Sequence, residues 1–192
     1  MGRHRFDPAK AHLLDHSERR KQLPPEKILQ ELQIRSSDTV LDLGAGTGYF
    51  TIPAAQMTEK VVYALDVEPR MLDLLEENVR RSKLTNVHLL PGTMENIPLE
   101  SQSVDKVIAS LVLHETDQLE KTLQEIRRVL RSGGTMLIVE WEKHEMEDGP
   151  PLTERISVEE MKEAIRTVGM EIQKCIRESH YYRLIAARSP NA

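Results

Sequence analysis

Short apolar runs alternate with longer segments of helical spacing along most of the chain. The runs predict seven strands, at residues 39–43, 60–66, 87–90, 104–110, 135–141, 171–178 and 181–187. Between them, apolar side chains that recur every three or four residues predict helices near 48–57, 69–82, 118–130 and 158–168. The early strands are nearly continuous apolar runs, which is typical of a sheet covered on both faces.

The order of these elements predicts the fold class. Strands that alternate with helices are joined by right-handed parallel crossovers, which build an open, doubly wound α/β sheet with helices on both faces. The last two runs are separated only by Ser179 and His180, which is hairpin spacing. We therefore expect a seven-stranded, mostly parallel sheet with an antiparallel last strand at the end of the sheet.

The N-terminal residues 1–25 differ from the rest of the chain. Basic clusters at 3–5 and 19–21 flank an amphipathic segment at 9–15, and a Pro-Pro pair then begins a helix at 26–33. We expect 1–25 to be a helical segment that folds over the ligand site as a lid. Residues 26–192 are expected to form the single main domain.

Composition narrows the class of protein. The 192 residues are 39% hydrophobic and 30% charged, which suits a real core under a charged surface. The longest apolar runs fall far short of the roughly 20 residues of a membrane span, and the N-terminus lacks the apolar core of a secretory signal. One cysteine excludes an internal disulfide framework and fits a cytoplasmic location. A net charge of −5 argues against broad nucleic-acid binding.

Candidate chemistry is concentrated where the first strand ends. Gly44, Ala45 and Gly46 begin a glycine-rich turn that leads into the helix predicted near 48–57. Glycines allow a ligand to approach the main chain closely, and the N–H groups of the helix start suit an anionic group. The second strand ends at Asp66, 20 residues after Gly46, where an acid can accept hydrogen bonds from both hydroxyls of a ribose.

Two cofactor classes use this layout. A nicotinamide site prefers Gly-x-Gly-x-x-Gly, with room for a pyrophosphate, whereas here the third glycine comes one residue early. The strand itself carries a carboxylate, Asp42, which is awkward beside a pyrophosphate and favourable beside a cationic ligand. These features favour a cofactor with a cationic group over a nicotinamide cofactor. An NAD-dependent oxidoreductase remains the alternative interpretation of the chain.

The motifs at 40–48, 62–66 and 130–134 resemble those of class I S-adenosylmethionine-dependent methyltransferases, over roughly 28–188. The chain is similar to small stand-alone quinone-biosynthesis C-methyltransferases. The resemblance implies a Rossmann-like fold and S-adenosylmethionine as cofactor, with S-adenosylhomocysteine as product. It also implies roles in cofactor binding: the methionyl part at Asp42, Gly44, Ala45, Gly46 and Ser110, the ribose at Asp66, and the adenine at Val67.

One departure from the family lies after the third strand. The family usually has Gly-Asp-Ala-Glu there, and this chain has Gly92-Thr93-Met94-Glu95. The backbone N–H and side chain of Met94 are expected to contact the adenine, and Glu95 is expected to replace the missing acid.

The resemblance also suggests where an acceptor molecule enters. His114, after the fourth strand, and Glu140, at the end of the fifth, are the candidate catalytic residues. An imidazole suits a general base near neutral pH. We expect methyl transfer to a small-molecule acceptor without a metal, and a non-catalytic cofactor-binding module is the other alternative. Each residue also has an ordinary structural interpretation, as a turn, cap or packing residue.

Overall fold

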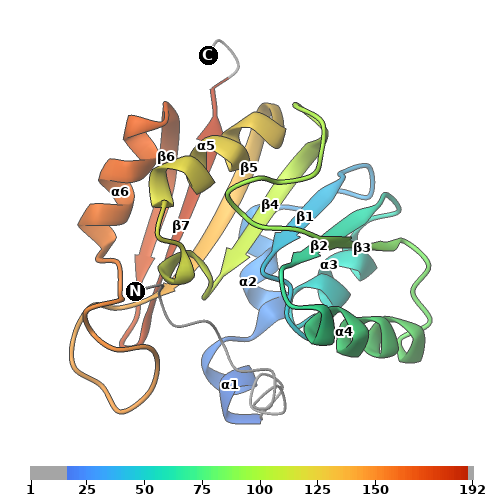
Figure 1. The fold of residues 1–192 in the computed structure, drawn as a ribbon, viewed down its shortest axis with the longest axis horizontal. Helices are drawn as coiled ribbons and strands as arrows, with labels where there is room; N and C mark the ends of the chain where they lie inside the picture. The colour runs from blue at the N-terminus through green and yellow to red at the C-terminus, as the bar shows by residue number, and fades with distance from the viewer. Residues whose placement is uncertain (1–16, 190–192) are drawn as a thin grey trace.

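The computed structural model describes residues 17–189, which form one seven-stranded sheet with helices on both faces (Figure 1). The strands are β1 (Val40–Leu43), β2 (Val62–Asp66), β3 (Val87–Pro91), β4 (Val104–Ser110), β5 (Leu130–Trp141), β6 (Met170–Arg177) and β7 (Tyr181–Arg188). The helices are α1 (Ser17–Gln22), α2 (Pro25–Leu32), α3 (Thr51–Met57), α4 (Pro69–Arg81), the short 3-10 helix η2 (Leu113–Glu115), α5 (Leu119–Val129) and α6 (Val158–Thr167).

The strand order is β3-β2-β1-β4-β5-β7-β6, and the five strands β1 to β5 run parallel to one another. The predicted fold class, a Rossmann-like doubly wound sheet, is confirmed. The last strand, β7, is antiparallel to both β5 and β6. Our expectation that it ends the sheet is wrong, because β7 lies between β5 and β6 and leaves β6 at the edge.

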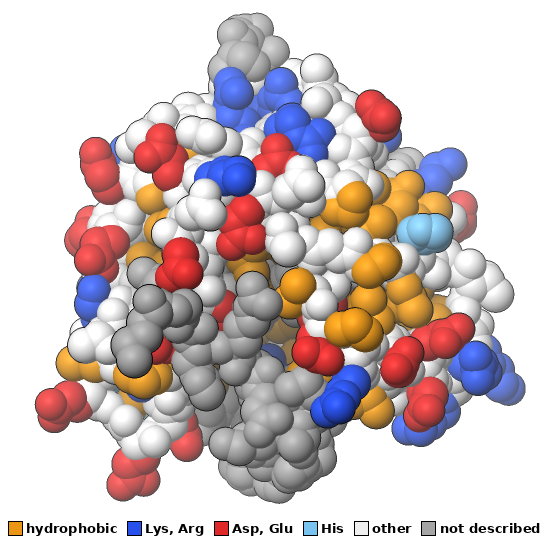
Figure 2. Space-filling view, in the orientation of Figure 1, with side chains coloured by type: hydrophobic (Ala, Val, Ile, Leu, Met, Phe, Trp, Pro, Cys, Tyr) orange, Lys and Arg blue, Asp and Glu red, His pale blue; other side chains and the backbone are white. Residues whose placement is uncertain are grey.

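The hydrophobic core has two layers because side chains alternate across each strand. On one face, Leu41 and Leu43 of β1 join a cluster built from α5 and α6. On the other face, Val40 joins a cluster built from α2 and α3, while α4 packs on Ala64 of β2. On the face with α5 and α6, Leu65 of β2 is buried, whereas Tyr63 of β2 and Leu90 of β3 are only partly buried, and apolar side chains reach the surface on this face (Figure 2).

Most element boundaries agree with the sequence pattern within a few residues. The clearest difference is α3, which begins at Thr51 and not at 48, because residues 44–50 form a succession of turns. Strand β5 begins five residues earlier than expected, at Leu130. No helix within the described residues is long and apolar enough to cross a membrane.

The expected lid falls largely outside the described residues, because 1–16 are not among them. Within the remainder, Leu23 is fully buried, and its carbonyl accepts a hydrogen bond from the Tyr49 hydroxyl at 2.7 Å. The Arg19 guanidinium lies over the Tyr49 ring at 4.4 Å from its centroid. Residues 17–25 are thus joined to the segment that follows the glycine turn.

Candidate functional site

The carboxyl ends of the parallel strands meet at one edge of the sheet, where Asp42, Asp66, Ser110 and Glu140 all lie. Strands β1 and β4 are neighbours in the middle of this edge. The chain leaves β1 toward β2 and leaves β4 toward β5, in opposite directions. This is a topological switch point, the place where open α/β sheets bind ligands.

The glycine turn is folded against the end of β2. The backbone N–H groups of Gly44 and Ala45 both donate to the Leu65 carbonyl at 2.9 Å. The N–H of Gly46 donates to the Asp66 carboxylate at 2.8 Å, and the N–H of Glu68 donates to the same carboxylate at 2.9 Å. The three N–H donors of the turn are therefore satisfied within the protein.

Positive φ angles explain the glycines of this turn. Gly44 and Gly46 have φ of 71° and 54°, a region that disfavours other side chains. A Cβ on Gly44 would lie 2.4 Å from Cγ2 of Val112, in the loop after β4. The turn after β1 and the loop after β4 are therefore in close contact, and only glycine fits between them.

Asp42 is a buried carboxyl group beneath this turn. It is 2% exposed, and the Thr51 hydroxyl donates to its Oδ2 at 2.6 Å. Burial raises the pKa of Asp42 to about 7, although the hydrogen bond from Thr51 acts in the opposite direction. Burial also raises the pKa of Asp66, against the N–H groups of Glu68 and Gly46. Two poorly solvated carboxyl groups thus flank one glycine turn.

His114 and Glu140 form a buried pair on the other side of the switch point. The His114 Nδ1 lies 2.9 Å from Oε2 of Glu140, and the His114 backbone N–H donates to Oε1 at 3.3 Å. The two side chains are 7% and 1% exposed. Burial disfavours the imidazolium, but the nearby carboxylates, Glu140 first and then Glu115 and Glu154, together outweigh burial and raise the pKa of His114 above its ordinary value.

The loop after β3 carries Met94 and Glu95. Met94 is half-buried and packs against the core cluster of α5 and α6. Glu95 accepts a hydrogen bond from the hydroxyl of Thr116 at 2.6 Å. Its carboxylate is thereby joined to the residue that follows η2, a contact that no local sequence pattern predicts.

Two further features leave the edge able to receive a ligand. The hydroxyl oxygen of Ser110 is buried and has no hydrogen-bond partner within residues 17–189. Val67, which directly follows Asp66, is an apolar side chain left 42% exposed. A buried polar atom without a partner among the described residues and an uncovered apolar side chain are both features that a bound ligand would satisfy.

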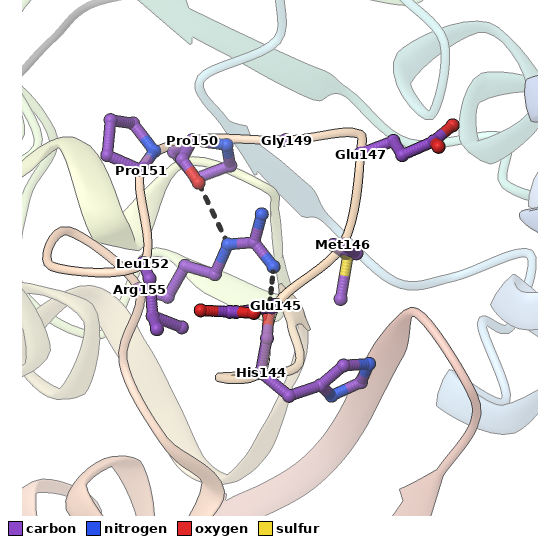
Figure 3. Close-up of a pocket in the computed structure, with 9 residues that line it drawn as sticks. All are labelled: His144, Glu145, Met146, Glu147, Gly149, Pro150, Pro151, Leu152 and Arg155. Carbon is purple, nitrogen blue, oxygen red and sulfur yellow. Dashed lines mark hydrogen bonds between the residues drawn. The ribbon is translucent and has the colours of Figure 1, made fainter.

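The loop between β5 and α6 is organised around Arg155 (Figure 3). Its guanidinium is buried and donates to four backbone carbonyls, those of Glu142, His144, Asp148 and Pro150, at 2.7 to 3.2 Å. It also lies over the Trp141 ring, 5.7 Å from the centroid. The loop borders an open hollow of about 660 Å³, which Met146, Pro151 and Leu152 line in part.

The structure thus gathers most of the predicted site residues at one edge and adds three that we did not predict. Thr51 supports Asp42, Val112 contacts the glycine turn, and Arg155 shapes the loop after β5. Only Thr51 has a sequence signal, as a hydroxyl at the start of the helix after the turn. Val112 and Arg155 act through contacts that no local pattern encodes.

Comparisons with known proteins agree with this geometry. The model of the methyltransferase domain family matches residues 34–187. An uncharacterized methyltransferase-like protein of Schizosaccharomyces pombe is 37% identical over 130 residues, which are 68% of this chain and 47% of that protein. The ubiquinone/menaquinone biosynthesis C-methyltransferase UbiE of Blochmanniella floridana is 32% identical over 117 residues, 59% of this chain and 46% of the relative. The chain thus spans about half the length of these two relatives.

A solved structure covers nearly the whole chain. The crystal structure of a SAM-dependent methyltransferase from Aquifex aeolicus superposes with a TM-score of 0.88 and 30% sequence identity, over 95% of this chain and 99% of that chain. The resemblance inferred from the motifs is confirmed. The chain belongs to the methyltransferase domain family and is an enzyme of the S-adenosylmethionine-dependent methyltransferase class.

Proposed function

We propose that this chain transfers a methyl group from S-adenosylmethionine to a small-molecule acceptor at the carboxyl edge of its sheet. The observation that carries the proposal is the pair of poorly solvated carboxyl groups, Asp42 and Asp66, on the two sides of one glycine turn at the switch point. A ligand that is cationic at one end and has a ribose in its middle suits this pair.

Different residues around the turn contact different parts of the cofactor. Asp42 faces the cationic amino end, and Gly44, Ala45 and Gly46 let the methionyl part approach the main chain. Ser110 offers its unpartnered hydroxyl to the same part. Asp66 accepts hydrogen bonds from the ribose hydroxyls. The adenine lies on the exposed Val67 and under Met94, with Glu95 on the same side.

When bound, S-adenosylmethionine supplies an electrophilic methyl group on a sulfonium. The protein then has to orient an acceptor and exclude water, and orientation alone can provide much of the rate. The hollow beside the Arg155 loop and the apolar side chains Met146 and Leu152 support an acceptor of modest size. A net charge of −5 favours such an acceptor over a nucleic acid.

His114 is the proposed general base, and Glu140 orients it. With the Nδ1 proton directed to Glu140 at 2.9 Å, Nε2 carries the lone pair that accepts a proton from the acceptor. Because Glu140 raises the pKa of His114, the neutral imidazole becomes dominant only above the ordinary range of a histidine. Turnover of an acceptor that loses a proton should therefore rise with pH through that raised pKa.

Calorimetry tests the cofactor assignment. S-adenosylhomocysteine should bind the purified chain, and NAD should not. Asp66→Ala should weaken binding of S-adenosylhomocysteine at least tenfold (about 1.4 kcal/mol), while Asp73→Ala, which removes an exposed carboxylate from α4, should leave it unchanged. Binding of NAD in place of S-adenosylhomocysteine would contradict the proposal.

A second experiment separates an enzyme from a non-catalytic binding module. A methyl-labelled donor is incubated with the chain and a small-molecule extract. Transfer of label should depend on the chain and should fall strongly in His114→Asn. Tight binding of S-adenosylhomocysteine with no transfer to any extract would favour the binding module, and full activity of the variant would reject His114 as the base.

A further inference from the structure

A hydrogen bond joins two loops on opposite sides of the proposed cofactor site. The hydroxyl of Thr116 donates to Oε1 of Glu95 at 2.6 Å, across 21 residues of sequence. Thr116 is 2% exposed and directly follows η2, the short helix that carries His114. The same hydroxyl oxygen accepts the backbone N–H of Gln118 at 3.0 Å. The contact is thus buried at Thr116 and made with a charged acceptor, which strengthens it.

The loop that carries Glu95 is itself held firmly. The backbone N–H of Ile97 donates to the Glu125 carboxylate on α5 at 2.9 Å, and Arg128 donates to the carbonyls of Ile97 and Leu99. Glu95 therefore reaches Thr116 from a loop that α5 already fixes. It is a rigid point from which the end of η2 can be held.

The segment that carries His114, η2, has little support within itself. It is only three helical residues long, and its first cap makes no side-chain hydrogen bond. It is preceded by Leu111, whose φ of 54° is unfavourable for a leucine, and by Val112, which contacts the glycine turn. Contact with Gly44 holds the start of the segment. The Thr116 hydroxyl holds its end through Glu95 and through the Thr122 hydroxyl on α5, 3.2 Å away.

We propose that Glu95 and Thr116 are positioning residues, which act through η2 to hold the His114 imidazole against Glu140. The inference rests on the proposed function for the role of His114 as base and for the adenine side of the loop. The adenine-side loop and the base are then parts of one rigid unit. Loss of the bond lets η2 shift, and a shift of about 1 Å is enough to break the hydrogen bond to Glu140.

The test is the pKa of His114, measured by NMR titration of the full chain without ligand. The signal is assigned by its disappearance in His114→Asn. The charged groups that face the ring are Glu140 on β5, Glu115 on η2 and Glu154 before α6, and none of them is altered by the variants. Glu95→Ala and Thr116→Val should each lower the pKa of His114 by about 0.5 or more, because the ring loses contact with Glu140.

Conservative variants separate positioning from charge. Glu95→Gln keeps an oxygen that accepts from Thr116, and Thr116→Ser keeps the hydroxyl, so both should retain the wild-type pKa. Glu120→Ala is the matched control, because it removes an exposed carboxylate from α5 outside this contact. An unchanged pKa in both Glu95→Ala and Thr116→Val would overturn the inference, and so would an equal fall in Glu120→Ala.

Affinity for S-adenosylhomocysteine distinguishes this inference from the function on which it rests. If Glu95→Ala weakens binding without moving the pKa of His114, Glu95 acts on the cofactor directly and the positioning role is rejected. If the wild-type chain binds no S-adenosylhomocysteine, the proposed function fails, whereas the titration of the unliganded chain still decides whether Glu95 and Thr116 position the imidazole.

Discussion

Asp42 occupies a place that disfavours its own charge. It is 2% exposed, and burial raises its pKa to about 7 against a single side-chain donor, Thr51. Near neutral pH the unliganded chain therefore holds a mixture of neutral and ionised carboxyl. A cationic amino group beside Asp42 favours the ionised form, so ligand binding and loss of this proton are linked.

The affinity for S-adenosylhomocysteine should therefore increase with pH. Below pH 7 Asp42 is mostly protonated and must lose its proton before it can pair with the amino group. Calorimetry at pH 6 and pH 8 should show about a tenfold increase in affinity. In Asp42→Asn the affinity should be lower and nearly independent of pH over this range. A flat profile in the wild-type chain would contradict the role of Asp42.

The same buried carboxyl should reduce stability. The pKa of Asp42 is raised on folding, so the unfolding free energy falls as pH rises from the unfolded value of 3.8 through about 7. At pH 8, Asp42→Asn should therefore be more stable than the wild-type chain, by on the order of 2–4 kcal/mol. Denaturant unfolding at pH 8 and pH 5 measures this, and a variant that is less stable at pH 8 would contradict it.

Glu140→Gln tests the buried pair. Glu140 raises the pKa of His114, so the pair stabilises the fold below the unfolded histidine value and loses this contribution as pH rises through the folded value. The variant should be less stable than the wild-type chain at pH 5.5, by about 1 kcal/mol, and the gap should narrow by pH 9. A gap that is constant with pH would show that Glu140 contributes packing alone.

At the scale of elements, the site depends on loops that contact one another more than on any single strand. The turn after β1 packs on the loop after β4, and that loop is joined through Thr116 to the loop after β3. The loop after β5 is held separately, by the four carbonyl contacts of Arg155. The loop after β5 therefore has a support of its own, separate from the contacts that join the other three loops.

Gly44→Ala tests the contact between the first two of these loops. The new Cβ meets Val112 at 2.4 Å and sits at a positive φ, whereas Gly133 has a similar φ with nothing within 4 Å of the added Cβ. Gly133→Ala should cost about 1 kcal/mol of stability from backbone strain alone. Gly44→Ala should cost about 2–4 kcal/mol and abolish binding of S-adenosylhomocysteine. Equal effects of the two variants would contradict the contact.

Arg155→Ala tests the separate support of the loop after β5. Removal of the guanidinium leaves four carbonyls of the loop without their donor, so hydrogen exchange should accelerate over residues 142–154. Affinity for S-adenosylhomocysteine should change less than twofold, since the glycine turn is not involved. A large loss of affinity for S-adenosylhomocysteine would show that the loop after β5 and the glycine turn are not independent.

The sequence pattern predicted the elements better than it predicted their contacts. Strand β1 and the glycine turn could be predicted because their residues are adjacent in the sequence. The place of Asp66 could be predicted because it ends the next strand. The partners of Arg155, in contrast, are backbone carbonyls, which any residue supplies. The bond between Glu95 and Thr116 joins two loops, and the distance between these loops depends on how α5 packs, which no local pattern predicts. Cys175 is exposed because β6 is an edge strand, and this position follows from the strand order and not from the local pattern.

At the scale of the whole molecule, the doubly wound topology is what brings the parts together. Because the crossovers leave β1 and β4 in opposite directions, residues more than 90 positions apart meet at one edge. In the proposed function, Asp42 and Asp66 lie on the cofactor side of this edge, and His114 and Glu140 lie on the acceptor side. S-adenosylmethionine should then extend from the first pair of residues toward the second.

The most direct test is a crystal structure of the chain with S-adenosylhomocysteine. The nucleoside should lie between the turn at Gly44–Gly46 and Asp66, with the amino end at Asp42 and the sulfur directed toward His114. A ligand bound elsewhere, or bound with its ribose away from Asp66, would contradict the proposed cofactor site.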